Sequence, residues 1–466
     1  MNELPRVLSL NFLRALYRNR PIVLFDVVET LLLRIAAAPD PAIFISSVAP
    51  EDLRQAAGEL LARAPDPASL PLWGIPFAVK DNVDVEGFAT TAACPAYAYR
   101  PRKDAETVAR LKAAGALVIG KTNLDQFATG LNGTRSPYGA PRCVFDAEYI
   151  SGGSSSGSAV AVAAGLASFA LGTDTAGSGR VPAAINNLVG IKPTPGLLSL
   201  SGVVPANPSL DCVSLLSLSV PEGTEIRRIA EGYDPEDPYS VRGVQKTWPS
   251  TLRLGVLTPQ VRVFDSDGES AVLYERAIET MRGFGAEVQT FNYSSFHEIG
   301  TLLYDGPWLA ERLAAIGSFT DAHPADLDPC VRLLLDKAHR SSAADAFAGL
   351  HRLQQLRRLT EREWEKVDCL LLPTVPAIYT IEAMRADPLG LNARLGYYTN
   401  FVNFLGGSAI AVPFGFKGNG LPFSVTLVAP AFHDDVLTGP AASLHAAAHC
   451  GAGIDRAAPI SSEAWP

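Results

Sequence analysis

Apolar side chains recur every third or fourth position in two parts of the N-terminal half, a spacing that predicts amphipathic helices. The first stretch covers residues 21–38. The second covers residues 104–115, where Asp104 is a candidate N-cap and Gly115 a candidate stop. We expect residues 1–65 to form a helical segment that packs on the remainder of the chain.

Short apolar runs alternate with the helical stretches and predict buried strands. These runs cover residues 75–79, 116–120, 188–192, 252–257 and 369–375. Alternating helices and strands are typical of an α/β fold, in which helices cover both faces of a largely parallel sheet. The apolar run at 158–172 is shorter than the roughly 20 residues of a membrane-spanning helix. The pattern therefore predicts no membrane segment.

Composition narrows the class of protein further. The chain has 466 residues, 47% of them hydrophobic, and a net charge of −9 without any block of Lys and Arg. An acidic chain of this kind is not expected to bind nucleic acid. Its six cysteines contain no CxxC pair, and no signal peptide is recognisable, so we expect reduced thiols and a cytoplasmic protein. We expect one domain over 1–440, with 441–466 as a tail or the start of a further domain.

The segment GALVIGKT, residues 115–122, matches the Walker A pattern at every position. A phosphate-binding loop needs flexible residues between its two glycines, so that backbone N–H groups can surround the phosphate. Here those residues are Ala-Leu-Val-Ile, which favour a buried strand. The motif therefore does not predict a nucleotide site.

The segment GSSSG, residues 153–157, fits the nucleophile elbow of α/β-hydrolases, with Ser155 as the nucleophile. That interpretation needs a preceding strand and a catalytic His, and no His lies in a recognisable site. His445 and His449 have the spacing of zinc ligands on a helix, but Ala446 stands where the accompanying Glu would be. We expect no metal.

A serine can instead be activated by a lysine, provided that burial lowers the lysine pKa. Lys80 directly follows the apolar run at 75–79 and is such a candidate. Lys121 and Lys192 lie in similar positions, so position alone does not choose among the three.

The segment LGTDTAGSGR, residues 171–180, brings small residues before Ser178. Successive backbone N–H groups at Thr175, Ala176 and Gly177 could form an oxyanion hole for that serine. An ordinary glycine-rich turn is the alternative for this segment taken alone.

Three motifs together carry a resemblance to a known family. They are PFAVKDN around Lys80, GGSSSGSAVAVAAG at 152–165 and LGTDTAGSGRVPAAINNLVGIKPT at 171–194. Ser154 and Ser178 are 24 residues apart. The chain resembles the amidase signature family over residues 40–430.

The resemblance implies an α/β amidase signature fold, with a large central mixed, mostly parallel sheet covered by helices on both faces. It implies that Ser178 is the nucleophile, that Lys80 is the base and that Ser154, held by a cis peptide bond, transfers protons between them. An ion pair between Asp174 and Arg180 is expected to brace the loop. No cofactor is implied.

Three further segments, 121–142, 209–214 and 302–316, resemble the allophanate hydrolase branch of the family. Allophanate is a small anionic amide, and a planar arginine side chain suits its carboxylate. We expect Arg312 to bind that carboxylate and Tyr304 to donate a hydrogen bond, two turns away on one side of a helix. The resemblance also implies release of ammonia in urea degradation, a homodimer and urea carboxylase as a possible functional partner.

Two departures from the branch accompany this resemblance. Pro208 stands where an arginine is often found before SLDC. Many such enzymes carry an additional C-terminal domain, and because the sequence given ends at Pro466, we expect either a short form or a part of a longer chain. The alternatives are another small-molecule amidase and the amide-hydrolysing subunit of a tRNA-dependent amidotransferase. A catalytically inactive binding protein is disfavoured, because Lys80, Ser154 and Ser178 are all retained.

Overall fold

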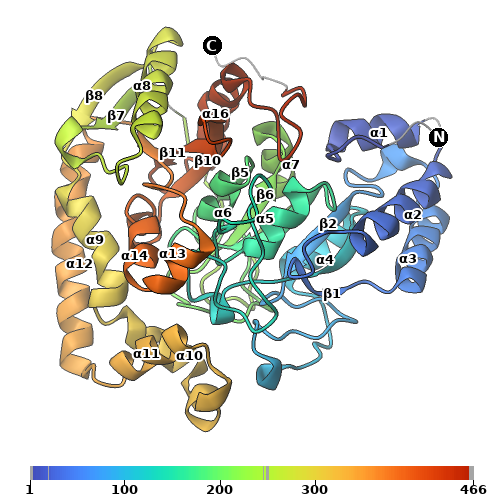
Figure 1. Ribbon diagram of the computed structural model, residues 1–466, viewed down its shortest axis with the longest axis horizontal. Coiled ribbons are helices and arrows are strands. Elements are labelled where there is room, and N and C mark those ends of the chain that lie inside the picture. The colour runs from blue at the N-terminus through green and yellow to red at the C-terminus, as the bar shows by residue number, and fades with distance from the viewer. Residues whose placement is uncertain (1–3, 19, 245, 248–250, 461–466) are drawn as a thin grey trace.

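One continuous sheet runs through the protein (Figure 1). The structure is a computed structural model that describes residues 4–18, 20–244, 246–247 and 251–460. Its strands are β1 Phe44–Ser47, β2 Pro76–Lys80, β3 Leu117–Thr122, β4 Phe169–Thr173, β5 Val189–Lys192, β6 Val213–Ser217, β7 Arg253–Leu257, β8 Glu287–Phe291, β9 Cys369–Pro373, β10 Ser408–Phe416 and β11 Pro422–Ala429. They lie in the order β1-β3-β2-β4-β6-β5-β10-β11-β9-β7-β8.

The sheet is mixed, and its parallel parts lie on either side of an antiparallel middle. Parallel pairs join β2 to β3 and β4, and join β7 to β8 and β9. The pairs that involve β6, β10 and β11 are antiparallel, as is the pair at the β1 edge. The predicted large mixed sheet with covering helices is confirmed, and each predicted apolar run forms a strand.

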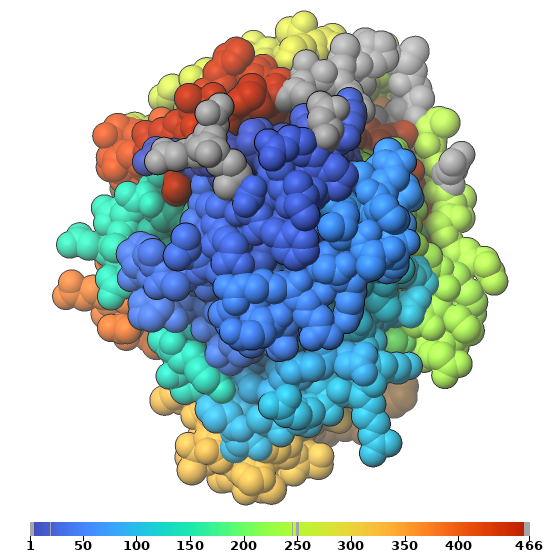
Figure 2. All heavy atoms as spheres, turned by 90° about the vertical axis from the view of Figure 1, so that its right-hand side faces the viewer, coloured from blue at the N-terminus to red at the C-terminus, as the bar shows by residue number. Residues whose placement is uncertain are grey.

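Sixteen α-helices surround the sheet in the described residues. They are α1 Leu10–Arg18, α2 Val23–Ala36, α3 Pro50–Arg63, α4 Glu106–Ala113, α5 Ser156–Ala163, α6 Arg180–Ile185, α7 Val220–Ala230, α8 Gly268–Gly283, α9 Ser294–Asp305, α10 Trp308–Ala322, α11 Pro329–Ala338, α12 Ala343–Trp364, α13 Ile381–Ala386, α14 Gly390–Leu395, α15 Phe401–Phe404 and α16 Asp434–Ala448. Helices α1 to α3 form much of one side of the molecule, in blue in Figure 2.

The helices predicted from apolar spacing correspond to α2 and α4, but the expected N-cap of α4 is wrong. The residue at that position is Ala105, and its side chain makes no capping bond. The carboxylate of Asp104 instead accepts a hydrogen bond from the Glu86 N–H at 2.8 Å and pairs with the Lys112 amine at 2.6 Å. Asp104 therefore joins two loops to α4 rather than starting the helix.

The apolar run at 158–172 forms most of α5 and the beginning of β4. Every residue of α5 is buried, and the helix packs against β2 and β4. Across the described residues, no helix combines the length and apolar character needed to cross a membrane. The expected division at residue 440 falls within α16, which packs on β10 and α7.

The sheet places two strand ends side by side near the serine-rich loop. Because β2 and β4 are parallel neighbours, with Val79 opposite Leu171, their carboxyl ends lie at the same edge. Lys80 ends β2 and Thr173 ends β4. This pairing brings residues 93 positions apart in the chain into contact.

The two histidines with zinc-ligand spacing lie in different environments. His445 is fully buried in α16, whereas His449 is exposed beyond the end of that helix. Neither ring nitrogen of His445 makes a well-formed hydrogen bond to the described residues. Burial lowers the His445 pKa to about 4, although the backbone at Gly451 opposes the shift in part. No metal-binding group of side chains is found in the described ranges.

We expect His445 to make the protein less stable in mild acid. A histidine in the unfolded chain has a pKa of about 6.5. The contribution of His445 to the free energy of unfolding is therefore complete above that pH and is lost as the pH falls toward 4. The full shift corresponds to about 3 kcal/mol. Urea unfolding of His445→Leu between pH 7 and pH 4.5 should therefore show a smaller loss of stability than the wild type shows.

His449→Asn is the matched control, because this histidine is exposed and Asn tolerates its left-handed backbone. This variant should follow the wild-type pH dependence. Parallel curves for His445→Leu and the wild type would contradict a buried neutral histidine.

Candidate active site

Lys80 is fully buried, and its amine contacts two hydroxyl groups. Its Nζ lies 2.8 Å from Ser154 Oγ and 2.7 Å from Thr173 Oγ1. Burial lowers the Lys80 pKa to about 7, against the opposing charges of Asp125, Asp174 and Asp211. A large fraction of this amine is therefore uncharged near neutral pH and can accept a proton from a hydroxyl group.

Ser154 lies in the loop before α5, where its peptide bond to Gly153 is cis. The Asp125 N–H donates to the Ser154 carbonyl at 3.2 Å, and the Gly153 N–H donates to the Leu131 carbonyl at 2.8 Å. A side chain at Gly153 would place Cβ 2.2 Å from the Asp125 carboxylate. Glycine is therefore required there, because the loop passes directly over Asp125.

Ser178 lies in the loop between β4 and α6 and is 2% exposed. Its Oγ is directed at the Gly130 carbonyl, at 3.4 Å. The Ser155 N–H donates to the Ser178 carbonyl at 3.2 Å, which joins the loops of the two serines. The hydroxyl groups of Ser154 and Ser178 thus lie in adjoining loops, although the Ser178 hydroxyl is oriented toward Gly130.

The backbone N–H groups before Ser178 have no hydrogen-bond partners in the described part of the chain. They belong to Thr175, Ala176 and Gly177, the residues predicted to form an oxyanion hole. Gly177 has φ +141°, and a Cβ there would lie 2.4 Å from Thr399 Oγ1. Unpaired donors in a buried loop are available to bind an anionic oxygen.

The expected ion pair between Asp174 and Arg180 is present and fully buried. Arg180 Nε and Nη2 each lie 2.9 Å from a different carboxylate oxygen of Asp174. Burial alone would raise the Asp174 pKa, but the Arg180 guanidinium overcomes this effect and lowers it. The same carboxylate accepts the Gly179 N–H at 3.2 Å. The pair therefore fixes the turn that follows Ser178.

Of the three candidate lysines, Lys80 alone contacts a serine hydroxyl in the described residues. Lys121 forms a fully buried ion pair with Asp81 at 3.0 Å and lies at the end of β3. Lys192 donates to the Pro193 carbonyl at 2.7 Å. The apolar centre of the Walker-like segment forms strand β3, so it is not a phosphate-binding loop.

The nucleophile-elbow interpretation of Ser155 does not fit its surroundings. No strand directly precedes the residue, which is the N-cap of α5. Its Oγ donates to the Thr173 carbonyl at 3.2 Å and accepts from the Thr173 N–H at 3.3 Å. The Ser155 side chain therefore joins α5 to β4, and backbone groups occupy its hydroxyl both as a donor and as an acceptor.

The expected placement of Tyr304 and Arg312 on one helix is wrong. Tyr304 belongs to α9 and Arg312 to α10, because Gly306 and Pro307 separate the two helices. Helices α9 and α10 still pack against each other. Tyr304 is half-buried and Arg312 is 2% exposed.

The Arg312 guanidinium is held by neutral oxygen atoms. Its Nη1 donates to Thr129 Oγ1 and to the Phe127 carbonyl, and its Nη2 donates to Asn207 Oδ1 at 2.8 Å. Its Nε has no partner, and no carboxylate lies within ion-pair distance among the described residues. Burial lowers the Arg312 pKa from its usual range. A buried cation in this state is suited to bind an anion.

Sequence reasoning missed three residues that hold the charged groups in place. Thr173 contacts the Lys80 amine, while Thr129 and Asn207 contact Arg312. Thr173 lies inside the segment LGTDTAGSGR, directly after the apolar run at 158–172, and this position was the available signal. Nothing in the sequence alone indicates which polar residues of the 121–142 and 204–212 loops face Arg312.

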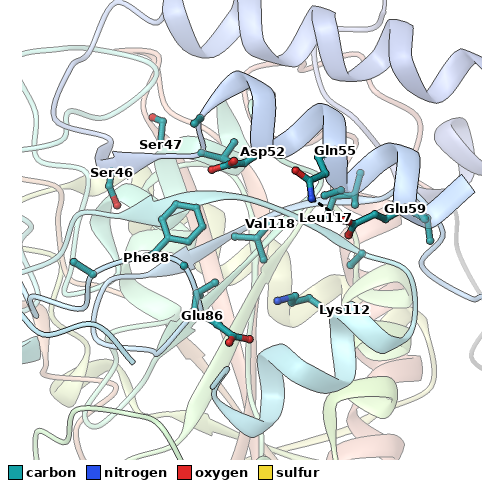
Figure 3. Close-up of a pocket in the computed structure, with 18 of the residues that line it drawn as sticks. Ser46, Ser47, Asp52, Gln55, Glu59, Glu86, Phe88, Lys112, Leu117 and Val118 are labelled. Atoms are coloured by element: carbon teal, nitrogen blue, oxygen red, sulfur yellow. Dashed lines mark hydrogen bonds between the residues drawn. The ribbon is translucent and has the colours of Figure 1, made fainter. Parts of the chain in front are cut away.

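A separate pocket of about 880 Å³ lies between α3, the neighbouring part of β3 and the loop around Phe88 (Figure 3). Its polar side chains largely have partners of their own. Gln55 donates to Glu59 at 2.8 Å, and Lys112 pairs with Asp104. None of the predicted site residues lines it, so the pocket is distinct from the Lys80 centre.

Comparisons with known proteins give matches over most of the chain. The family model described as Amidase matches residues 26–438. A urea amidolyase of Saccharomyces cerevisiae is 44% identical over 415 residues, which cover 88% of this chain and 22% of that protein. This chain therefore spans about a fifth of the length of the urea amidolyases that it matches.

Solved structures and a second group of relatives extend the comparison. A structure of Kluyveromyces lactis allophanate hydrolase superposes with a TM-score of 0.90 at 38% identity, covering 96% of this chain and 74% of that one. A glutamyl-tRNA(Gln) amidotransferase subunit from Symbiobacterium thermophilum is 34% identical over 465 residues, covering 92% of this chain and 94% of that protein.

The buried Lys121–Asp81 pair makes Lys121 a structural residue rather than a nucleotide ligand. We expect Lys121→Met to lower the free energy of unfolding by about 3–5 kcal/mol, because Asp81 is left buried without a counter-charge. Urea denaturation measures this loss, and calorimetry with ATP should detect no binding to the wild type.

The double variant Asp81→Asn, Lys121→Met is the control, since it removes both charges and should recover much of the lost stability. The Thr91 N–H, which donates to Asp81 at 2.9 Å, keeps an acceptor in that variant. ATP binding that disappears in Lys121→Met would contradict this assignment.

Proposed function

This chain belongs to the amidase family, and on that premise we propose that it is an allophanate hydrolase. The enzyme would cleave the terminal amide of allophanate (urea-1-carboxylate) and release ammonia, with carbon dioxide as the eventual other product. The observation that carries this proposal is the buried Arg312 guanidinium, which has no carboxylate partner among the described residues. The similarity to a protein named allophanate hydrolase supports it.

We assign the catalytic roles to Lys80, Ser154 and Ser178. Ser178 attacks the amide carbonyl while Ser154 takes its proton and gives its own proton to Lys80, the final base. The 2.8 Å contact between Lys80 Nζ and Ser154 Oγ supports the second transfer. Ser178 turns from Gly130 toward Ser154 when substrate binds, because catalytic hydrogen bonds commonly tighten only in the complex.

The loop before Ser178 supplies the oxyanion hole in this mechanism. The unpaired N–H groups of Thr175, Ala176 and Gly177 bind the oxygen that becomes negative when the carbonyl is attacked. Ser154 passes a proton to the leaving nitrogen, and ammonia departs. Water then attacks the acyl-enzyme, and Ser178 regains its proton through the same relay.

Recognition of a substrate carboxylate distinguishes the proposed activity from that of a general amidase. Arg312 binds the carboxylate and Tyr304 donates a hydrogen bond to the substrate, from two helices that meet at this place.

The alternatives remain hydrolysis of another small amide and the amide-hydrolysing role in a tRNA-dependent amidotransferase. The second is less supported, because the matched amidotransferase subunits are 31–34% identical whereas the matched urea amidolyases are 42–44% identical. Pro208, which replaces an arginine often found there, leaves Arg312 as the cation that we assign to the carboxylate.

Urea degradation provides the wider context that we propose. Urea amidolyases are much longer than the region matched here, and we propose that a urea carboxylase supplies the allophanate. A homodimer and a cytoplasmic location complete the proposal. The six cysteines, none of which forms a disulfide bond, support a reducing environment.

We expect Ser178→Ala to fold normally and to lose essentially all amidase activity, because the covalent intermediate cannot form. Ammonia release should be measured with allophanate, glutamine, malonamate and simple aliphatic amides as substrates. The wild type should prefer allophanate. Substantial turnover by the variant would shift the nucleophile to another serine, with Ser155 the first to test.

We expect Arg312→Met to reduce kcat/KM for allophanate while changing that for biuret far less. Biuret carries an amide in place of the carboxylate, so it leaves no charge without a partner. Loss of a contact to a desolvated charge costs about 2–5 kcal/mol, which corresponds to tens- to thousands-fold in rate. Equal losses for both substrates at unchanged stability would mean that Arg312 does not bind the carboxylate.

A further inference from the structure

Asn207 lies in the loop before β6 and is fully buried beside Arg312. Its Oδ1 accepts the Arg312 Nη2–H at 2.8 Å. Its Nδ2 donates to the Trp308 carbonyl at 2.6 Å and to the Glu311 carboxylate at 3.2 Å. All of these contacts reach the first turns of α10, so one amide side chain fixes both the helix and its arginine.

The contacts of Arg312 differ in kind from those of Arg180, which is also buried. Arg180 is neutralised by a bidentate pair with Asp174. The bonds of Arg312 are instead accepted by an amide oxygen, a hydroxyl and a carbonyl. A neutral acceptor orients a guanidinium and leaves its charge uncompensated.

The two acidic groups nearest Arg312 are committed elsewhere. The Glu311 carboxylate accepts the Ser209 N–H at 2.8 Å as well as the Asn207 amide. The Asp211 carboxylate accepts the Asn207 N–H at 3.0 Å and bonds the Thr175 hydroxyl. Neither group therefore forms an ion pair with the guanidinium among the described residues, and Nε of Arg312 is left without a partner.

We propose that Asn207 is a specificity-determining positioning residue that orients Arg312 without neutralising it. The uncharged side chain of Asn207 makes the enzyme select amide substrates that carry a carboxylate. This inference rests on the proposed function, since it assumes that Arg312 binds the carboxylate of the substrate.

The same residue connects carboxylate binding to the nucleophile loop. Arg312 donates to the Asn207 side chain, the Asn207 N–H donates to the Asp211 carboxylate, and the Thr175 hydroxyl donates to that same carboxylate. Thr175 begins the segment that supplies the oxyanion hole. Placement of the carboxylate and placement of the attacked carbonyl thus depend on one loop.

The charge-swap variant Asn207→Asp, Glu311→Gln tests this role. It puts a carboxylate against Arg312 and reverses the donor and acceptor between positions 207 and 311, so it keeps the hydrogen bond between them. Glu311→Gln alone is the matched control, and Asn207→Ala removes the acceptor without adding charge. Each variant is assayed for kcat and KM with allophanate and with biuret, after urea unfolding has checked its stability.

We expect the charge-swap variant to lower the allophanate-to-biuret ratio of kcat/KM on the order of 100-fold, because a buried carboxylate competes with the substrate. Asn207→Ala should lower the ratio less, and Glu311→Gln should keep it. A purely structural role predicts losses of similar size for both substrates, because the charge-swap variant also loses the bond to the Trp308 carbonyl and would disturb the loop for either one. An unchanged ratio in the charge-swap variant overturns the inference alone.

A wild type without preference for allophanate over biuret overturns both the inference and the proposed function. Should the charge-swap variant fail to fold, Thr129 provides the second test, because its hydroxyl accepts from Nη1 of the same guanidinium. Thr129→Val should raise the KM for allophanate and leave biuret turnover nearly unchanged, and Thr129→Ser should restore the wild-type KM. Equal effects of Thr129→Val on allophanate and biuret turnover would overturn the inference that neutral acceptors orient Arg312.

Discussion

Burial of the Lys80 amine, with no ion-pair partner among the described residues, is the constraint on which the candidate site depends. An ammonium group removed from water is costly, and it responds by losing its proton more easily. The two hydroxyl groups that contact Nζ are bonding partners for an uncharged amine as well as a charged one. A carboxylate in their place would hold the amine charged and remove its value as a base. The sheet enforces this arrangement, because the ends of β2 and β4 adjoin.

Carboxylates do lie around the amine, and the structure commits each of them to other groups. Asp174 is bound by Arg180, and Asp125 accepts the backbone N–H groups of Asn132, Gly133 and Arg135. Burial raises the Asp125 pKa despite the nearby Arg135. The acids therefore organise loops rather than neutralise the base. A glycine-rich sequence makes this possible, since Gly153 passes over the Asp125 carboxylate without a side chain to obstruct it.

The parts of the molecule that could be predicted from sequence are those encoded by contiguous residues. The strands β2, β3, β5, β7 and β9 follow from apolar runs, and the serine and lysine motifs follow from a resemblance that spans most of the chain. The antiparallel middle of the sheet was not predicted, because strand direction depends on partners that lie far away in the chain. Arg312 and Tyr304 were chosen by resemblance, but the break at Gly306 and Pro307 placed them on different helices. Asn207 and Thr129 were missed because their roles exist only where separate loops meet α10.

The distribution of charge in the site is consistent with an anionic substrate. Burial raises the Asp211 pKa, and the oxygens of this carboxyl group are occupied by the Thr175 hydroxyl and two backbone N–H groups. Among the described residues, the donors of the site without a partner are then the amides before Ser178 and Nε of Arg312, whose guanidinium also lacks a counter-charge. A substrate with a carbonyl at one end and a carboxylate at the other satisfies both. A neutral amide would satisfy the first and leave a buried cation without a counter-charge, so the cost of desolvating Arg312 itself favours the charged substrate.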